Sequence, residues 1–92
     1  MQITTGNLPN AQSGRFYNQT LQASGGPGSF TWTVSAGKLP PGIYLDSATG
    51  KIYGKAALKG VWNFTITVQD SQNSSATAIK NFTIEVKLYS GL

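Results

Sequence analysis

The sequence predicts an all-β fold, a two-sheet Greek-key sandwich of about seven strands. Apolar residues alternate with polar ones along most of the chain, the alternating stretches are short, and glycine or proline stands between many of them. Half-buried antiparallel strands show this alternation because one face packs while the other meets water. No stretch has helical periodicity, and many short strands joined by turns favour a sandwich.

Period-two alternation defines the expected strands and their inward faces. The clearest stretches are FTWTV from Phe30, VWNFTITV from Val61 and NFTIEV from Asn81. Their inward aromatic residues, which we expect in the core, are Phe30, Trp32, Trp62, Phe64 and Phe82. The stretch YNQTLQA adds inward positions before them. In all, strands are expected near residues 2–5, 16–23, 29–36, 43–45, 51–54, 61–70 and 77–87.

Turn residues separate these strands and are densest in KLPPGIYLDSATGKIYGKAALKG, from Lys38 to Gly60. Pro40 and Pro41 fix φ and lack amide donors, so a central strand cannot run through them. A hairpin follows, and we expect Asp46 to accept hydrogen bonds from backbone N–H groups in its loop. Gly50 can supply a positive φ there. Turns are also expected at Gly25-Gly-Pro-Gly and over residues 71–75.

The register of this hairpin follows from side-chain alternation. Joining Leu45 to Ile52 keeps the apolar residues on one face and pairs Tyr44 with Tyr53. A slip of one residue would turn the apolar side chains of one strand to solvent, so it is disfavoured. The two tyrosines should therefore lie side by side on the outer surface, with their rings partly exposed.

The composition indicates a polar surface with few charges. Only 11% of the residues are charged, against about 25% in average proteins, while ten Thr, nine Ser, six Asn and six Gln are present. Such a surface suits a secreted or cell-surface protein. The net charge of +4 comes from scattered cations rather than one basic face, so we expect no nucleic-acid partner. No apolar run approaches ~18 residues, so no membrane insertion is expected.

The domain organisation is expected to be simple. Ninety-two residues suit one domain over residues 1–92, which we expect to be a monomer. No signal peptide precedes the first strand, and we interpret the chain as a module excised from a longer multidomain protein. Residues 88–92 are expected to be a linker or tail. The chain has no Cys, so it forms no disulfide. A domain of this size can bury one core without such a cross-link.

The stretch LPPGIYLDSATGKIYG, followed by GVWNFTITVQD, resembles the signature of the bacterial putative-Ig family, close to the cadherin-like domains. That signature runs LPxGLxLxxxTGxIxGTPxxxGxYxFTVxVxD. The match is close over Leu39–Asp70 and extends to nearly the whole chain. In two departures, the Gly-Thr-Pro of the family is Gly54-Lys55-Ala56, where the chain crosses between sheets, and its usual Tyr is Trp62. The lost proline concerns the crossover and not the fold.

The resemblance implies an Ig-like, cadherin-like sandwich that serves as a non-catalytic module of a bacterial surface or secreted protein. Such domains often stand in tandem and act as spacers, stalks or adhesion units. The implied location is extracellular or at the cell surface. The implied partners are neighbouring domains of the same chain and a cell-surface glycan or protein, and no cofactor is implied.

Catalytic and metal chemistry find little support in the residues. The chain has no His and no Cys, which removes triads and thiol nucleophiles. The three acids, Asp46, Asp70 and Glu85, fall in a turn, at a strand end and at an outward position rather than as a pair. Asp70, followed by Ser-Gln-Asn, is the candidate calcium ligand, which a neighbouring domain would have to complete. The simpler interpretation is that Asp70 organises its turn.

Aromatic residues in the outward phase supply the alternative function. These residues are Phe16, Tyr44 and Tyr53. Flat exposed rings stack on sugar faces, so Tyr44 and Tyr53 are the candidate ligand-binding residues of a carbohydrate-binding module. The simpler interpretation is that the two tyrosines pair with each other on the hairpin, a contact worth a few tenths to ~1 kcal/mol.

Two further patterns have both a functional and a structural interpretation. Lys51, Lys55 and Lys59 cluster around the crossover and would suit an anionic wall polymer, although a solvated loop is the simpler account. Glycosylation sequons occur four times. We interpret the sequons as structural, at Asn18, Asn63, Asn73 and Asn81.

Overall fold

A computed structural model gives the fold of residues 2–25, 29–72 and 75–88. These residues form nine strands and no helix. The strands are β1 (Gln2–Ile3), β2 (Ala11–Gln12), β3 (Phe16–Thr20), β4 (Ala23–Ser24), β5 (Phe30–Gly37), β6 (Ile43–Asp46), β7 (Lys51–Lys55), β8 (Gly60–Asp70) and β9 (Thr77–Lys87).

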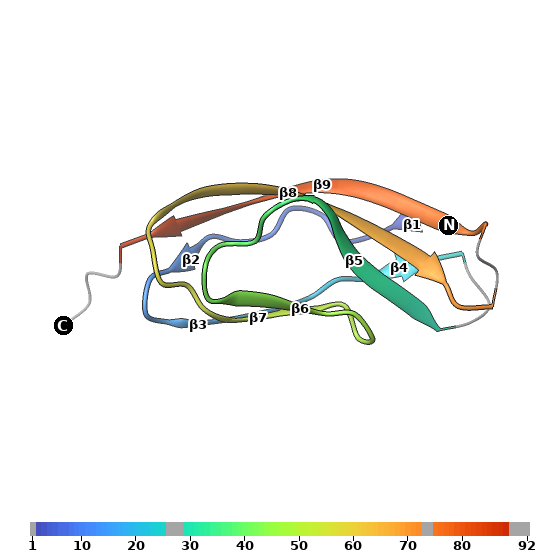
Figure 1. Cartoon of the computed structure of the whole chain (residues 1–92), viewed down its shortest axis with the longest axis horizontal. Helices are drawn as coiled ribbons and strands as arrows, with labels where there is room; N and C mark the ends of the chain where they lie inside the picture. The colour runs from blue at the N-terminus through green and yellow to red at the C-terminus, as the bar shows by residue number, and fades with distance from the viewer. Residues whose placement is uncertain (1, 26–28, 73–74, 89–92) are drawn as a thin grey trace.

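The strands make two main sheets that face each other along the long axis of the molecule (Figure 1). One sheet has the order β2-β9-β8-β5, and the other has the order β3-β7-β6. The short pair β1-β4 lies at one end. The chain crosses between the main sheets after β5 and returns after β7, through the segment where the sequence predicted a crossover. The predicted all-β two-sheet sandwich is confirmed.

Two strands of the structure differ from the sequence prediction. Strand β2 was not predicted because its two residues are too short to show alternation, and they pair in parallel with Val86 and Lys87 at the end of β9. The strand expected over 16–23 is split into β3 and β4. The split occurs because Leu21 N–H donates to the Gly50 carbonyl, while Gln22 N–H donates to Thr5 Oγ1.

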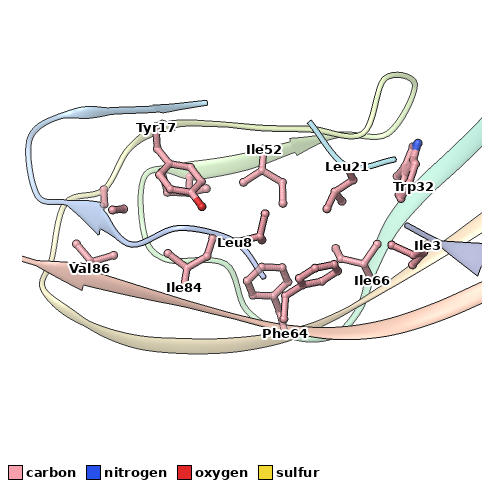
Figure 2. Close-up of a cluster of buried hydrophobic side chains, with 14 of the residues drawn as sticks. Ile3, Leu8, Tyr17, Leu21, Trp32, Ile52, Phe64, Ile66, Ile84 and Val86 are labelled. Atoms are coloured by element: carbon pink, nitrogen blue, oxygen red, sulfur yellow. The ribbon is translucent and has the colours of Figure 1, made fainter. Parts of the chain in front are cut away.

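The core fills the space between the sheets. Figure 2 shows Tyr17, Leu21 and Ile52 pointing from one layer toward Phe64, Ile66, Ile84 and Val86 of the other. The Phe64 and Phe82 rings stack across β8 and β9 with centroids 6.1 Å apart. The inward phases read from the sequence are confirmed for Trp32, which is 3% exposed, and for these two phenylalanines.

Two aromatic residues expected in the core lie at its edge instead. Phe30 and Trp62 are only half-buried and pack against the core from outside it. Phe30 contacts Trp32 edge-on with ring centroids 6.4 Å apart. The Trp62 ring lies against Gly60 at the start of β8, because residues two apart on a strand share a face.

Tyr17 ties the N-terminal segment to the core. Its ring is buried, and its Oη–H donates to the Pro9 carbonyl oxygen at 2.8 Å. Burial raises the pKa of Tyr17 from 10.0 to about 12, because the phenolate loses its hydration. A pKa raised on folding contributes stability that is fully present below pH 10.0 and is lost as the pH rises through about 12.

We therefore expect Tyr17→Phe to cost about 0.5–1.5 kcal/mol at neutral pH, through the lost hydrogen bond. The variant should also lose less stability than the parent between pH 10 and 12, since Phe has no proton to release. Denaturant unfolding at several pH values measures both effects. In an absorbance titration at 295 nm, the variant should lack the phenol that the parent titrates near pH 12. If the variant instead lacked a phenol that titrates near pH 10, the raised pKa of Tyr17 would be contradicted.

Candidate functional site

The β6–β7 hairpin is held by the turn residues that the sequence indicated. Asp46 Oδ1 accepts a hydrogen bond from Ala48 N–H at 2.9 Å, and the Asp46 carbonyl accepts one from Gly50 N–H at 2.9 Å. Gly50 has a φ of 76°, in the region that favours glycine. Its Cα also lies against the indole of Trp32. A Cβ added to Gly50 would be only 2.8 Å from Trp32 Cε2, so a larger residue does not fit there.

The hairpin has the register that alternation predicted. Leu45 lies opposite Ile52, and Tyr44 lies opposite Tyr53. Tyr44 is 59% exposed and Tyr53 is 41% exposed. Their ring centroids are 6.1 Å apart, with the planes inclined at 47°. The two tyrosines therefore form a pair on the outer surface of the three-stranded sheet.

Strand β3 extends this outer surface on the other side of β7. Phe16 lies opposite Lys55, and Asn18 lies opposite Tyr53. Phe16 is 81% exposed, and Lys55 Nζ lies 4.6 Å from the centroid of its ring. We call this surface the aromatic–lysine face, and it consists of Phe16, Asn18, Tyr44, Lys51, Tyr53 and Lys55.

The interpretation of the lysines as residues of a solvated loop is wrong for two of them. Lys51 and Lys55 are the two ends of β7, and only Lys59 lies in the crossover loop. The period of two along β7 places Lys51, Tyr53 and Lys55 on one side. The spacing of two between Lys51, Tyr53 and Lys55 in the sequence carries this signal.

The aromatic–lysine face is shallow and open. A hollow of about 250 Å³ lies beside Tyr53, and its lining includes Phe16, Asn18 and Lys51. Both lysines are exposed. The face combines ring surfaces, an amide and two ammonium groups, which suit recognition of a ligand rather than bond-making chemistry.

Asp70 occupies a different position, at the end of β8. It is 1% exposed, and its Oδ1 accepts a hydrogen bond from Gln72 N–H at 2.8 Å. Asp70 N–H donates to the Ala76 carbonyl across the turn. This geometry is that of a turn-organising residue. Within residues 2–25, 29–72 and 75–88, no three His, Cys, Asp or Glu residues group as metal ligands would.

The three acids are distributed over both sheets. Asp46 ends β6, whereas Asp70 and Glu85 belong to the four-stranded sheet, with Asp70 buried and Glu85 exposed. A general acid–base pair needs two titratable groups that converge on one place. The arrangement of these carboxyl groups provides no such pair.

Two of the sequons pair with each other across β8 and β9. Asn63 lies opposite Thr83, and Thr65 lies opposite Asn81. Thr83 Oγ1–H donates to Asn63 Oδ1 at 2.6 Å, and Thr65 Oγ1–H donates to Asn81 Oδ1 at 2.7 Å. These bonds supply the structural role that the sequence suggested. Asn18 belongs to the aromatic–lysine face, and Asn73 lies outside the described residues, as do most of residues 88–92 and of the Gly25-Gly-Pro-Gly turn.

A comparison with protein families matches residues 2–87 to the family described as the putative Ig domain. The chain belongs to this family. PKD and cadherin domains are structurally similar to it and share the two-sheet architecture described above. Domains of this kind are typically non-catalytic. A comparison with curated proteins finds no match.

Solved structures with the same fold include parts of larger proteins. A putative alpha-galactosidase of Bacteroides fragilis is 24% identical with a TM-score of 0.76, over 91% of this chain and 17% of that one. The extracellular domain of Protocadherin GammaB4 is 15% identical with a TM-score of 0.62, over 95% of this chain and 16% of that one. This putative Ig domain thus spans less than a fifth of each protein.

The PKD domain from the KIAA 1837 protein matches over almost its whole length. It is 19% identical with a TM-score of 0.64, over 99% of this chain and 90% of that one. At these identities the likenesses establish the fold. Among the described residues of this putative Ig domain, no helix is long and apolar enough to cross a membrane.

We expect Gly50→Ala to destabilise the putative Ig domain by about 1–3 kcal/mol more than Gly14→Ala, through the clash with Trp32. Gly14 is the matched control because it has a φ of 78°, close to that of Gly50, and open space around its Cα. Both variants pay for a strained φ, and only Gly50→Ala overpacks the core. Chemical denaturation measures the free energy of unfolding of both variants. Equal losses would contradict the prediction, because they would mean that the Trp32 side chain moves aside without a cost.

Proposed function

We propose that this putative Ig domain is a non-catalytic extracellular module that acts as a spacer, stalk or adhesion unit in a bacterial surface or secreted protein. The observation that carries the proposal is the position of its two ends. Strand β1 lies at one end of the long axis, and β9 runs out at the other (Figure 1). The molecule extends 48 Å along this axis and 18 Å along each of the others.

An elongated sandwich of this kind adds length when it is joined to others through its ends. Strands β8 and β9 have 11 residues each and pair along most of their length, so they form a continuous ladder parallel to the long axis. Neighbouring domains of the same chain are the proposed partners. The extracellular location is supported by the family, by the protocadherin likeness and by the uncharged polar surface.

Small-angle X-ray scattering of tandem proteins with one, two and three copies tests the spacer role. Because each copy enters at one end and leaves at the other, the maximum dimension should rise by about 40–50 Å per copy, close to the 48 Å long axis. A rise close to the 18 Å short axis would mean that copies fold back side by side, and the spacer proposal would fail.

A second function is favoured by the aromatic–lysine face, and it is carbohydrate binding through Tyr44 and Tyr53. The two rings are exposed and paired on the outer face of the three-stranded sheet. Exposed aromatic rings supply rigid contact area at a low cost in conformational entropy. The fold likeness to part of a putative alpha-galactosidase agrees with a module that accompanies a carbohydrate-active enzyme.

A polysaccharide array that holds neutral and acidic polymers tests this second function. The parent domain should bind at least one polymer, and Tyr44→Ala/Tyr53→Ala should lower that signal at least tenfold, since both stacking surfaces are removed. Val61→Ala/Ile79→Ala is the matched control, because it removes two exposed apolar side chains from the other sheet. Equal losses in the two double variants would contradict a sugar platform at the tyrosines.

A further inference from the structure

Two lysines flank the stacking residue Tyr53 along one strand. Lys51 and Lys55 stand two positions before and after it on β7, so all three side chains project from the same side of the sheet. At ~3.4 Å per residue, the row from Lys51 to Lys55 is about 14 Å long. Lys55 Nζ lies 4.6 Å from the centroid of the Phe16 ring, which places this ammonium group above an exposed apolar surface.

The charge of the aromatic–lysine face is positive because most carboxylates lie elsewhere. Asp70 and Glu85 belong to the opposite sheet. Asp46 lies opposite Lys51 at one end of the face, and its Oδ1 already accepts a hydrogen bond from Ala48 N–H. At the other end, Lys55 is paired in register with Phe16 and not with an acid.

We infer that the aromatic–lysine face binds a polysaccharide whose sugars carry carboxylates, a polyuronate. This inference rests on the second function proposed above and names its ligand class. A uronic acid ring has an apolar face that stacks on tyrosine and a carboxylate at its edge. Tyr44 lies across from Tyr53 on the neighbouring strand, whereas Lys51 and Lys55 stand on either side of Tyr53 along β7. A sugar stacked on Tyr53 therefore lies between the two lysines, and the carboxylates at the edges of the stacked sugars reach their ammonium groups.

The spacing of the charges favours this ligand over denser polyanions. Nucleic-acid binders concentrate basic residues along the path of the phosphates, whereas this face offers two lysines with Asp46 beside one of them. Heavily sulfated polymers would likewise leave most of their charges unpaired on it. A polyuronate has one charge per sugar and needs few cations, and Asn18 in register with Tyr53 adds an amide for its hydroxyl groups.

Isothermal titration calorimetry with two matched polymers tests the inference. Polygalacturonate carries the carboxylates, and its methyl-esterified form has the same backbone with the charges removed. At 150 mM NaCl, the domain should bind polygalacturonate at least tenfold more tightly than the ester, because exposed charges remain effective at contact distance. Lys51→Gln/Lys55→Gln should remove most of this preference, and Tyr44→Ala/Tyr53→Ala should weaken binding of both polymers.

The control for general attraction between opposite charges is Lys38→Gln/Lys87→Gln. It removes the same charge from exposed positions outside the face, and its affinity should change less than threefold. An equal loss in both lysine variants would overturn the inference. Tighter binding of dextran sulfate or oligothymidine than of polygalacturonate would also overturn it. Equal affinity for the two galacturonate polymers would refute the charge claim, and binding of neither would refute the polyuronate inference. The second function fails separately, if no polymer on the array binds through Tyr44 and Tyr53.

Discussion

The burial of Ile52 is the constraint on which the rest of the three-stranded sheet depends. Its side chain is 0% exposed, and β7 lies between β3 and β6, with a partner on each side. Because side chains alternate along a strand, an inward Ile52 requires Lys51 and Tyr53 to point outward. A shift of one residue would bury a lysine or a tyrosine hydroxyl in the core, at a cost of several kcal/mol. The chemistry of the outer face is therefore fixed by the packing of the inner one.

Glycines allow close approaches around the β6–β7 hairpin, both between its two strands and against Trp32 of the other sheet. A Cβ on Gly42 would collide with the carbonyl oxygen of Lys55, and a Cβ on Gly54 would collide with the carbonyl oxygen of Gly42. A Cβ on Gly50 would collide with the indole ring of Trp32. Three glycines of the family signature, Gly42, Gly50 and Gly54, are thus positions where a side chain has no room. The outward residues of β6 and β7 have no such restriction, and the binding proposals rest on them.

Local pattern was sufficient to predict the hairpin, its register and the exposed pair Tyr44 and Tyr53, because the two strands are separated by a single short turn. Long-range pairings were not accessible in this way. Nothing in the residues near Phe16 indicates that it pairs with Lys55, or that Ala11 pairs in parallel with Val86. These partners are chosen by the closure of the whole sandwich. The aromatic–lysine face therefore combines a part that the sequence shows and a part that only the assembled sheet brings together.

The parallel pairing of β2 with β9 has a mechanical consequence. The chain enters β2 from the end of the long axis where β1 lies, and β9 ends near the opposite end (Figure 1). Tension applied through the two ends of the domain therefore pulls β2 and β9 in opposite directions. The load falls on their bonds, including Ser13 N–H to the Lys87 carbonyl, together rather than one at a time. Hydrogen bonds sheared in parallel resist more force than bonds opened in succession. The shortest strand pairing in the four-stranded sheet thus stands where a stretched stalk would carry its load.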